Sequence, residues 1–248
     1  MMLNAEIAAV LAEDISTLAI LQDRELSPGV LASLQELTFP DNLGLLPLEE
    51  ISRRAFAMMR EVVTSFPERP DVAFMDDMAA DFAAIYLTGS LGASPYESYW
   101  LSDDHLICQD AMFDMRTLYA EAGLRVPDWR MRPDDHLVFQ LQFIARQLKR
   151  ASREDDWRSL ANFLDFHLLR WLPDFASRVV NRCDTPFYAA LALLTDVWCQ
   201  QLRDLIAQHL GVSRPTAEAI EEHQRSQRIV EVKEVPIHFM PGVAGPSW

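Results

Sequence analysis

The chain has 248 residues, half of them apolar, and only 8 glycines, a composition that favours one large helical core over a many-stranded sandwich or barrel. Its formal net charge of −15 excludes sequence-independent binding of nucleic acid, because such binding needs clustered Lys and Arg. A cationic partner suits this charge better. A solvated acidic surface would carry the same charge, so charge alone does not choose between these two interpretations.

Helical periodicity dominates the first half of the chain. Ser27 and Pro28 supply an N-cap and a first-turn proline, and Gly89 and Gly123 each supply a helix-ending glycine. Between Gly89 and the next helix lies a loop that ends in an aromatic string. We therefore predict helices over residues 3–22, 27–37, 48–65, 71–88 and 109–122.

The second half repeats this pattern after an irregular, proline-containing stretch at 124–133. Long apolar stripes predict three strong helices over 134–150, 155–177 and 186–210. A polar piece at 215–227 can also form a helix. The segment 229–239 is rich in β-branched residues and is expected to be extended, with Pro236 limiting it to a sheet edge or a free strand.

The expected fold is all-α, a single globular bundle of about nine to ten helices in two halves joined by a hinge loop, with an extended C-terminal tail. We predict one domain over 1–211, with halves at 1–123 and 134–211, a hinge at 124–133, and an extension at 212–248. No basic leader and no stretch of roughly 18 uncharged apolar residues is present, which predicts a cytoplasmic protein.

Metal and nucleophile motifs are absent. The six histidines are scattered, and Cys108, Cys183 and Cys199 form neither a disulfide framework nor a zinc knuckle. His105 and Cys108 make one close pair, too few ligands for a site. The chain contains no G-x-S-x-G nucleophile motif, no phosphate-binding P-loop and no G-x-G-x-x-G dinucleotide-binding motif. We predict no catalytic residue, metal or cofactor.

Two carboxylates follow Pro133 at the start of a predicted helix. Asp134 and Asp135 in a first turn would accept hydrogen bonds from free N–H groups and oppose the positive end of the helix dipole. An imidazolium is disfavoured there, so the ring of His136 should be neutral and hydrogen-bonded. Asp135 and His136 are also the candidate acid and base of a hydrolase, although adjacent helical side chains do not face each other.

Four short stretches resemble one family. Arg132-Pro-Asp-Asp-His136, followed by a long apolar helix, is similar to the E-P-x-D-H signature of the redox enzyme maturation chaperones that include TorD, DmsD and NarJ. The chain has Arg132 where that signature has Glu. The other three stretches, in the family's order between residues 50 and 210, are Glu97–Asp103, Phe163–Trp171 with His167 and Trp171, and Thr185–Tyr188 with Pro186 and Phe187.

The resemblance implies a cytoplasmic chaperone and no enzyme. It implies binding of the twin-arginine signal peptide, the apo form of a molybdopterin-dependent oxidoreductase, or both, to assist cofactor insertion and prevent premature export. The partner is then a DMSO- or TMAO-reductase-like enzyme, and the chaperone is a monomer or homodimer. The peptide-binding residues it implies at the hinge are Tyr96, Tyr99, Trp100, Trp129, Pro133, Asp135 and His136.

A twin-arginine leader offers two guanidinium groups and an apolar segment, so its receptor should place carboxylates beside an exposed apolar groove. We expect Asp135 to supply a carboxylate and the aromatic loop to supply the groove. Two alternatives remain open. One is a helical metal- or nucleotide-dependent hydrolase using Asp135 and His136, and the other is an assembly subunit in which 229–239 pairs with another copy.

Overall fold

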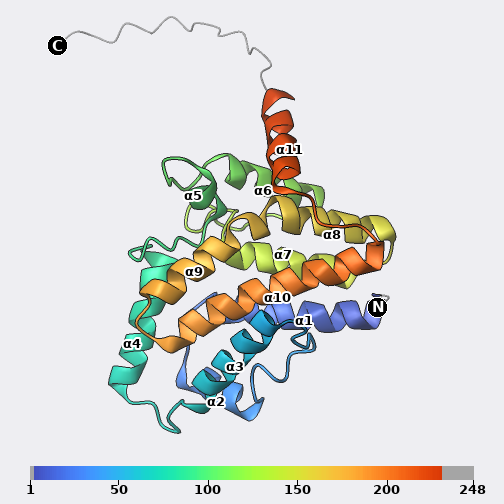
Figure 1. Ribbon diagram of the computed structural model, residues 1–248. Coiled ribbons are helices and arrows are strands. Elements are labelled where there is room, and N and C mark those ends of the chain that lie inside the picture. Colours follow the sequence, from blue (N-terminus) through green and yellow to red (C-terminus); the bar gives the residue numbers. More distant parts are fainter. Residues whose placement is uncertain (1–2, 231–248) are drawn as a thin grey trace, which may run out of the picture. The chain divides into compact units, whose positions relative to one another are not determined.

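The computed structural model describes residues 3–230, which group into two compact units. Residues up to Arg214 form the first, here called the body, and residues from Pro215 onward form the second. The regular elements in the described part of the body are all helices, with no strand among them, which confirms the all-α prediction. Its elements (Figure 1) are α1 (Ala5–Leu21), α2 (Pro28–Glu36), α3 (Glu50–Thr64), α4 (Val72–Phe82), a π-helical turn (Ala83–Leu87), α5 (Glu97–Leu101), α6 (Asp110–Glu121), α7 (Leu137–Arg150), α8 (Glu154–Phe166), a 3-10 turn (Leu168–Arg170), α9 (Leu172–Arg182) and α10 (Pro186–Leu210).

Helix α10 forms the centre of the core. It packs against α3, α8 and α9 and runs through the middle of the body in Figure 1, with buried side chains along its whole length. Helix α1 packs along α7. Helices from both halves of the sequence therefore share one hydrophobic core. Residues 124–133 form a helix-free loop as expected, and their action as a hinge stays a prediction.

The predicted helix over 155–177 is wrong as a single element. Helix α8 ends at Phe166, and His167 leaves the helical region with φ −125° and ψ −86°. After a 3-10 turn, α9 begins at Leu172 with Pro173 in its first turn. Proline lacks an N–H and clashes with the carbonyl four residues earlier, so it fits a first turn and not a helix interior. The apolar stripe continues across the break because both helices face the same core.

Two smaller corrections bear on the site. Helix α7 begins at Leu137 and not at residue 134, and residues 97–101, expected to belong to a loop, form the short helix α5. In the second unit, α11 (Ala217–Val230) includes Ile229 and Val230, so the prediction of an extended segment over 229–239 is wrong for those two residues. Residues 231–239 lie outside the described part of the chain. Helix propagation adds one hydrogen bond per residue, which outweighs the weak β-branched preference.

No helix among residues 3–230 combines the length and the apolar composition needed to cross a membrane.

Candidate functional site

Two of the four motif stretches are joined through their backbones. Tyr96 and His136 form an isolated antiparallel bridge. The N–H of Glu97 donates to the carbonyl of Asp135 at 3.2 Å, and the N–H of Leu137 donates to the carbonyl of Pro95 at 2.8 Å. The start of α5 and the start of α7, about forty residues apart in sequence, therefore lie side by side. We call residues 95–98, 135–140 and His167 the junction.

Asp135 is completely buried in the junction. Its Oδ2 accepts hydrogen bonds from the Ser98 N–H at 2.8 Å and from the Ser98 hydroxyl at 2.5 Å. Burial raises the pKa of Asp135, and the hydrogen bonds from Ser98 oppose that rise. The side chain is therefore committed to α5. The expectation that Asp135 supplies a carboxylate to the leader stays a prediction, and this structure buries that carboxylate.

The helix-start role predicted for the two aspartates is also wrong. Asp134 is buried and pairs with Arg116 of α6 at 2.8 Å, and Asp135 binds Ser98. The cap of α7 is instead His136, whose Nδ1 accepts a hydrogen bond from the N–H of Val138 at 3.1 Å. With the aspartates turned toward neighbouring elements, the imidazole nitrogen is the acceptor left for the first turn.

The ring of His136 is neutral, as predicted. It is 1% exposed and stands edge-on to Tyr96, with 5.0 Å between ring centroids. Burial, and secondarily the charge of Arg132, hold the pKa of His136 well below its ordinary value of 6.5. Because Nδ1 accepts a hydrogen bond, the proton resides on Nε2, which is buried and has no partner among the described residues.

Glu97 brings a third motif stretch into the junction. This carboxylate is 1% exposed, and its two oxygens lie 2.8 Å from Nε2 of Gln140 and 3.1 Å from Nδ1 of His167. Gln140 also donates to the carbonyl of Asp135 at 3.1 Å. Glu97, Ser98 and Gln140 were not among the predicted site residues. Gln140 lies one helical turn after His136, a spacing that in retrospect places both side chains on one face.

The fourth motif stretch, Thr185–Tyr188, lies outside the junction, at the start of α10. Asp81 of α4 accepts hydrogen bonds from the N–H groups of Asp184 and Thr185, which fixes the entry to α10 at Pro186. Phe187 packs against Phe66 at 5.8 Å. Trp171 is likewise fully buried, edge-on to Phe175. Trp171 and Phe187 therefore lie in the core, and the structural role expected for them stays a prediction.

The predicted aromatic residues divide by exposure. Tyr99 and Trp100 are half-buried, and the indole N–H of Trp100 donates to the carbonyl of Ser94 at 2.8 Å. Pro133, also among the predicted site residues, is buried. Trp129 of the hinge loop is 41% exposed, and the guanidinium of Arg116 lies 4.8 Å from its ring centroid. Their assignment to peptide binding stays a prediction.

An exposed surface surrounds the junction. We call residues 102–113 and 128–131 the rim. The N–H of Gln109 donates to Oγ of Ser98 at 3.2 Å, which joins the first rim segment to the junction. Arg116 lies over both Phe113 and Trp129 and pairs with Asp134, the residue before the junction, which links the second rim segment to it. The rim exposes five large apolar side chains and four acids. They are Leu106, Ile107, Phe113, Trp129 and Met131, with Asp103, Asp104, Asp110 and Asp128.

The rim loop is held in a costly backbone conformation. His105 and Cys108 have φ of 52° and 60°, in the left-handed region that L-residues seldom adopt. The hydrogen bonds from Gln109 to Ser98 and from Leu106 to the hydroxyl of Ser102 hold the loop there. Such strain persists where the surroundings impose it, and here it displays Leu106 and Ile107 to solvent.

Comparison with known proteins decides the family. The family model described as "Nitrate reductase delta subunit" matches residues 49–177, more than half of the chain. The chain belongs to this family. Chaperone protein TorD of Photobacterium profundum is 29% identical over 171 residues, which are 66% of this chain and 77% of that protein. TorD of Salmonella arizonae is 29% identical over 181 residues, covering 71% and 82%, and TorD of Shewanella oneidensis is 33% identical over 144 residues, covering 55% and 64%.

These matches confirm the resemblance to the family that includes TorD, DmsD and NarJ. The region matched by the nitrate reductase delta subunit model contains the whole junction and the whole rim. The stretch at 185–188 lies beyond it. Three of the four motif stretches used for the resemblance therefore meet in one network inside the matched region.

Arg132 departs from the family signature and has a defined place. Its guanidinium pairs with the carboxylate of Asp23 and donates to the carbonyl of Asp23 at 3.1 Å, and it lies 5.7 Å from the ring centroid of Phe139. Arg132 thus ties the end of the hinge loop to the turn that follows α1.

The hydrolase alternative finds little support at Asp135 and His136. Both side chains are buried, so a substrate has no access to them in this conformation. Across residues 3–230 no three His, Cys, Asp or Glu side chains are grouped in a way that could hold a metal ion.

Proposed function

We propose that this chain is a cytoplasmic maturation chaperone for a molybdopterin-dependent oxidoreductase, of the DMSO or TMAO reductase kind. In this proposal it binds the enzyme's twin-arginine signal peptide, its apo form, or both, so that cofactor insertion precedes export. Membership in the family and the TorD relatives support the chaperone role. The rim is the observation that supports leader binding, because it combines exposed apolar side chains with exposed acids.

The leader's two parts match the two kinds of rim side chain. Arginine guanidinium groups pair with carboxylates in a bidentate fork, and Asp103 and Asp104 are adjacent and exposed. The apolar segment of the leader would cover Trp129 and Met131, which are 41% and 80% exposed. Exposed aromatic and methionine side chains of this kind provide adaptable apolar contacts.

Asp135 and His136 take a different role in this proposal. A leader guanidinium could reach Asp135 only by breaking its hydrogen bonds to Ser98 and entering a buried site. Both steps cost free energy. The two signature residues therefore position the rim, and the rim contacts the peptide.

Binding of a fluorescent synthetic leader, carrying the Arg-Arg pair and its apolar segment, to the full-length protein tests the proposal. Fluorescence anisotropy should show that Trp129→Ala combined with Met131→Ala weakens binding about tenfold or more, as expected when central apolar contacts are removed. Asp103→Asn with Asp104→Asn should weaken it about threefold to tenfold. A leader with Lys-Lys should bind less tightly, because Lys lacks the fork.

Matched controls exist on α4 and on the loop before α3. Asp76→Asn with Asp77→Asn removes the same charge from another exposed pair, and Leu46→Ala removes a side chain that is 68% exposed. Both should leave affinity unchanged. Equal binding by the rim variants and these controls would refute the rim as the leader site.

A further inference from the structure

A groove runs along the outer face of the α1 and α7 pair. It has a volume of about 360 Å³ and is lined by Ser16 of α1 and by the last two turns of α7, through Gln142, Ala145, Arg146, Lys149 and Arg150. None of these residues belongs to the junction or the rim. The groove is therefore a second surface feature of the body, separate from the proposed leader site.

The groove concentrates positive charge in a chain of net charge −15. Arg146, Lys149 and Arg150 follow one another at helical spacing, and none of them forms an ion pair with the side chains that the structure describes. Some arginines elsewhere have such partners, as Arg60 has in Asp41 and Arg203 has in Asp165, whereas others, such as Arg69, have none among the described residues. A cation near a helix C-terminus is favourable, which accounts for the sign of these residues but not for their lack of partners.

Arg146 has a buried polar atom without a partner, as His136 also has at Nε2. The Nε of Arg146 is buried and has no hydrogen-bond acceptor among the described residues. Buried polar groups in proteins are normally paired, so this donor is satisfied best by an acceptor that a ligand brings into the groove. A carboxylate is the acceptor that matches a guanidinium most closely.

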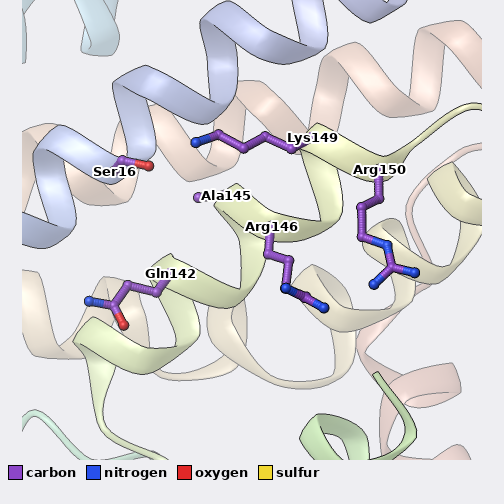
Figure 2. Close-up of a pocket in the computed structure, with 6 residues that line it drawn as sticks. All are labelled: Ser16, Gln142, Ala145, Arg146, Lys149 and Arg150. Carbon is purple, nitrogen blue, oxygen red and sulfur yellow. The ribbon is translucent and has the colours of Figure 1, made fainter. Parts of the chain in front are cut away.

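The directions of the side chains indicate the kind of ligand. Figure 2 shows Lys149 reaching toward Ser16 of α1, whereas Arg146 and Arg150 extend away from α1. The three charges do not converge on one point, as they would around a single phosphate. Spread over more than a helical turn, they fit a ligand with several carboxylates spaced along a chain.

We propose that the groove between α1 and α7 is a docking site for an acidic segment of a partner protein, with carboxylates on Arg146, Lys149 and Arg150 and an apolar side chain over Ala145. This surface acts independently of leader binding at the rim. Association should be fast and salt-sensitive, because attraction between exposed opposite charges is screened by ions.

The test uses the full-length protein and a fluorescein-labelled helical peptide with Glu and Leu at spacings of three and four, beside the same peptide with Gln for every Glu. The Glu peptide should bind and the Gln peptide should not. Lys149→Gln with Arg150→Gln should weaken binding about tenfold, the size expected for two exposed ion pairs. Charge reversal by Lys149→Glu with Arg150→Glu should abolish it and confer binding of a Lys version of the peptide.

Arg69→Gln with Arg125→Gln is the matched control, because both arginines are exposed, outside the groove and without an ion pair in the described residues, and the net charge changes equally. This control should bind the Glu peptide like the parent protein, and all variants should keep the parent's leader affinity. Equal weakening by the control, equal binding of the Gln peptide or no binding of the Glu peptide would overturn the proposal. Displacement of the Glu peptide by stoichiometric inorganic pyrophosphate would overturn it in favour of a small anion. A change in sedimentation on mutating the groove would overturn it in favour of self-association.

Discussion

The junction buries its charged side chains, whereas the neighbouring rim exposes large apolar side chains. In the junction Glu97 and Asp135 are 1% and 0% exposed, and each is hydrogen-bonded within the protein. In the rim Met131 is 80% exposed and Trp129 is 41% exposed. Both carboxylates of the junction are withdrawn from solvent, and of their four oxygens only Oδ1 of Asp135 has no partner among the described residues. The difference agrees with our proposal that the junction sets geometry and the rim makes contact.

Hydrogen bonds donated by backbone N–H groups explain why the two depend on each other. Helix α5 and the loop after it are connected to α7 across the start of both helices, and α6 packs beside α5. Changes in the junction should therefore lower stability and, through misplacement, binding. Changes in the rim should affect binding alone. Stability measurements can separate these outcomes.

The largest expected effect comes from Asp135→Ala. It leaves the N–H and hydroxyl of Ser98 without their buried acceptor, and losing such an acceptor costs about 2 to 4 kcal/mol of unfolding free energy. Urea unfolding followed by circular dichroism measures the loss. Asp103→Ala, an exposed control in the rim, should change stability by less than about 0.5 kcal/mol. If the two variants are equally stable, the assignment of Asp135 to the architecture is wrong.

The sequence predicts the helices well but not the buried polar contacts between them. Helical periodicity and caps such as Ser27 located most of the helices, because apolar spacing and capping are local properties. The break at His167 was missed because the apolar stripe continues through it into α9, although Pro173 was a usable local signal.

The burial of Asp135 could not be predicted in the same way. It depends on Ser98, 37 residues away, and on Glu97 meeting Gln140 across 43 residues. Periodicity describes one element at a time and carries no information about such pairing. The motif stretches identified the family, which the family match confirms, but they could not show which side chains face inward.

A smaller effect is expected at His136, and it depends on pH. Its folded-state pKa lies well below 6.5, so the unfolded chain takes up a proton first as pH falls, and stability present above about pH 6.5 is lost toward pH 5. The unfolding free energy falls by at most about 1.4 kcal/mol per pH unit for one proton. His136→Asn keeps an N-cap acceptor for Val138 without a titrating ring, so its unfolding free energy should fall less between pH 7 and pH 5.

The pH comparison needs an exposed histidine as its control. His105→Asn should follow the parent protein across the same range. The raised pKa of Asp135 acts in the opposite direction, since its contribution is present at low pH and lost as pH rises through the folded value. The difference between the parent and His136→Asn removes this shared contribution. Parallel curves for the parent and His136→Asn would show that the His136 ring is accessible to protons in the folded state.

The smallest effect on stability is expected for Trp129→Ala, and it gives the clearest contrast with the junction. The side chain is 41% exposed, and its removal forfeits contacts with the guanidinium groups of Arg116 and Arg130, each worth about 0.5 to 1 kcal/mol at an exposed site. Thermal unfolding should therefore show a small shift, while leader affinity falls by a larger factor than for any junction variant of equal stability. If Trp129→Ala instead destabilised the protein as much as Asp135→Ala, the hinge loop would belong to the architecture, and the separation between a positioning junction and a contacting rim would fail.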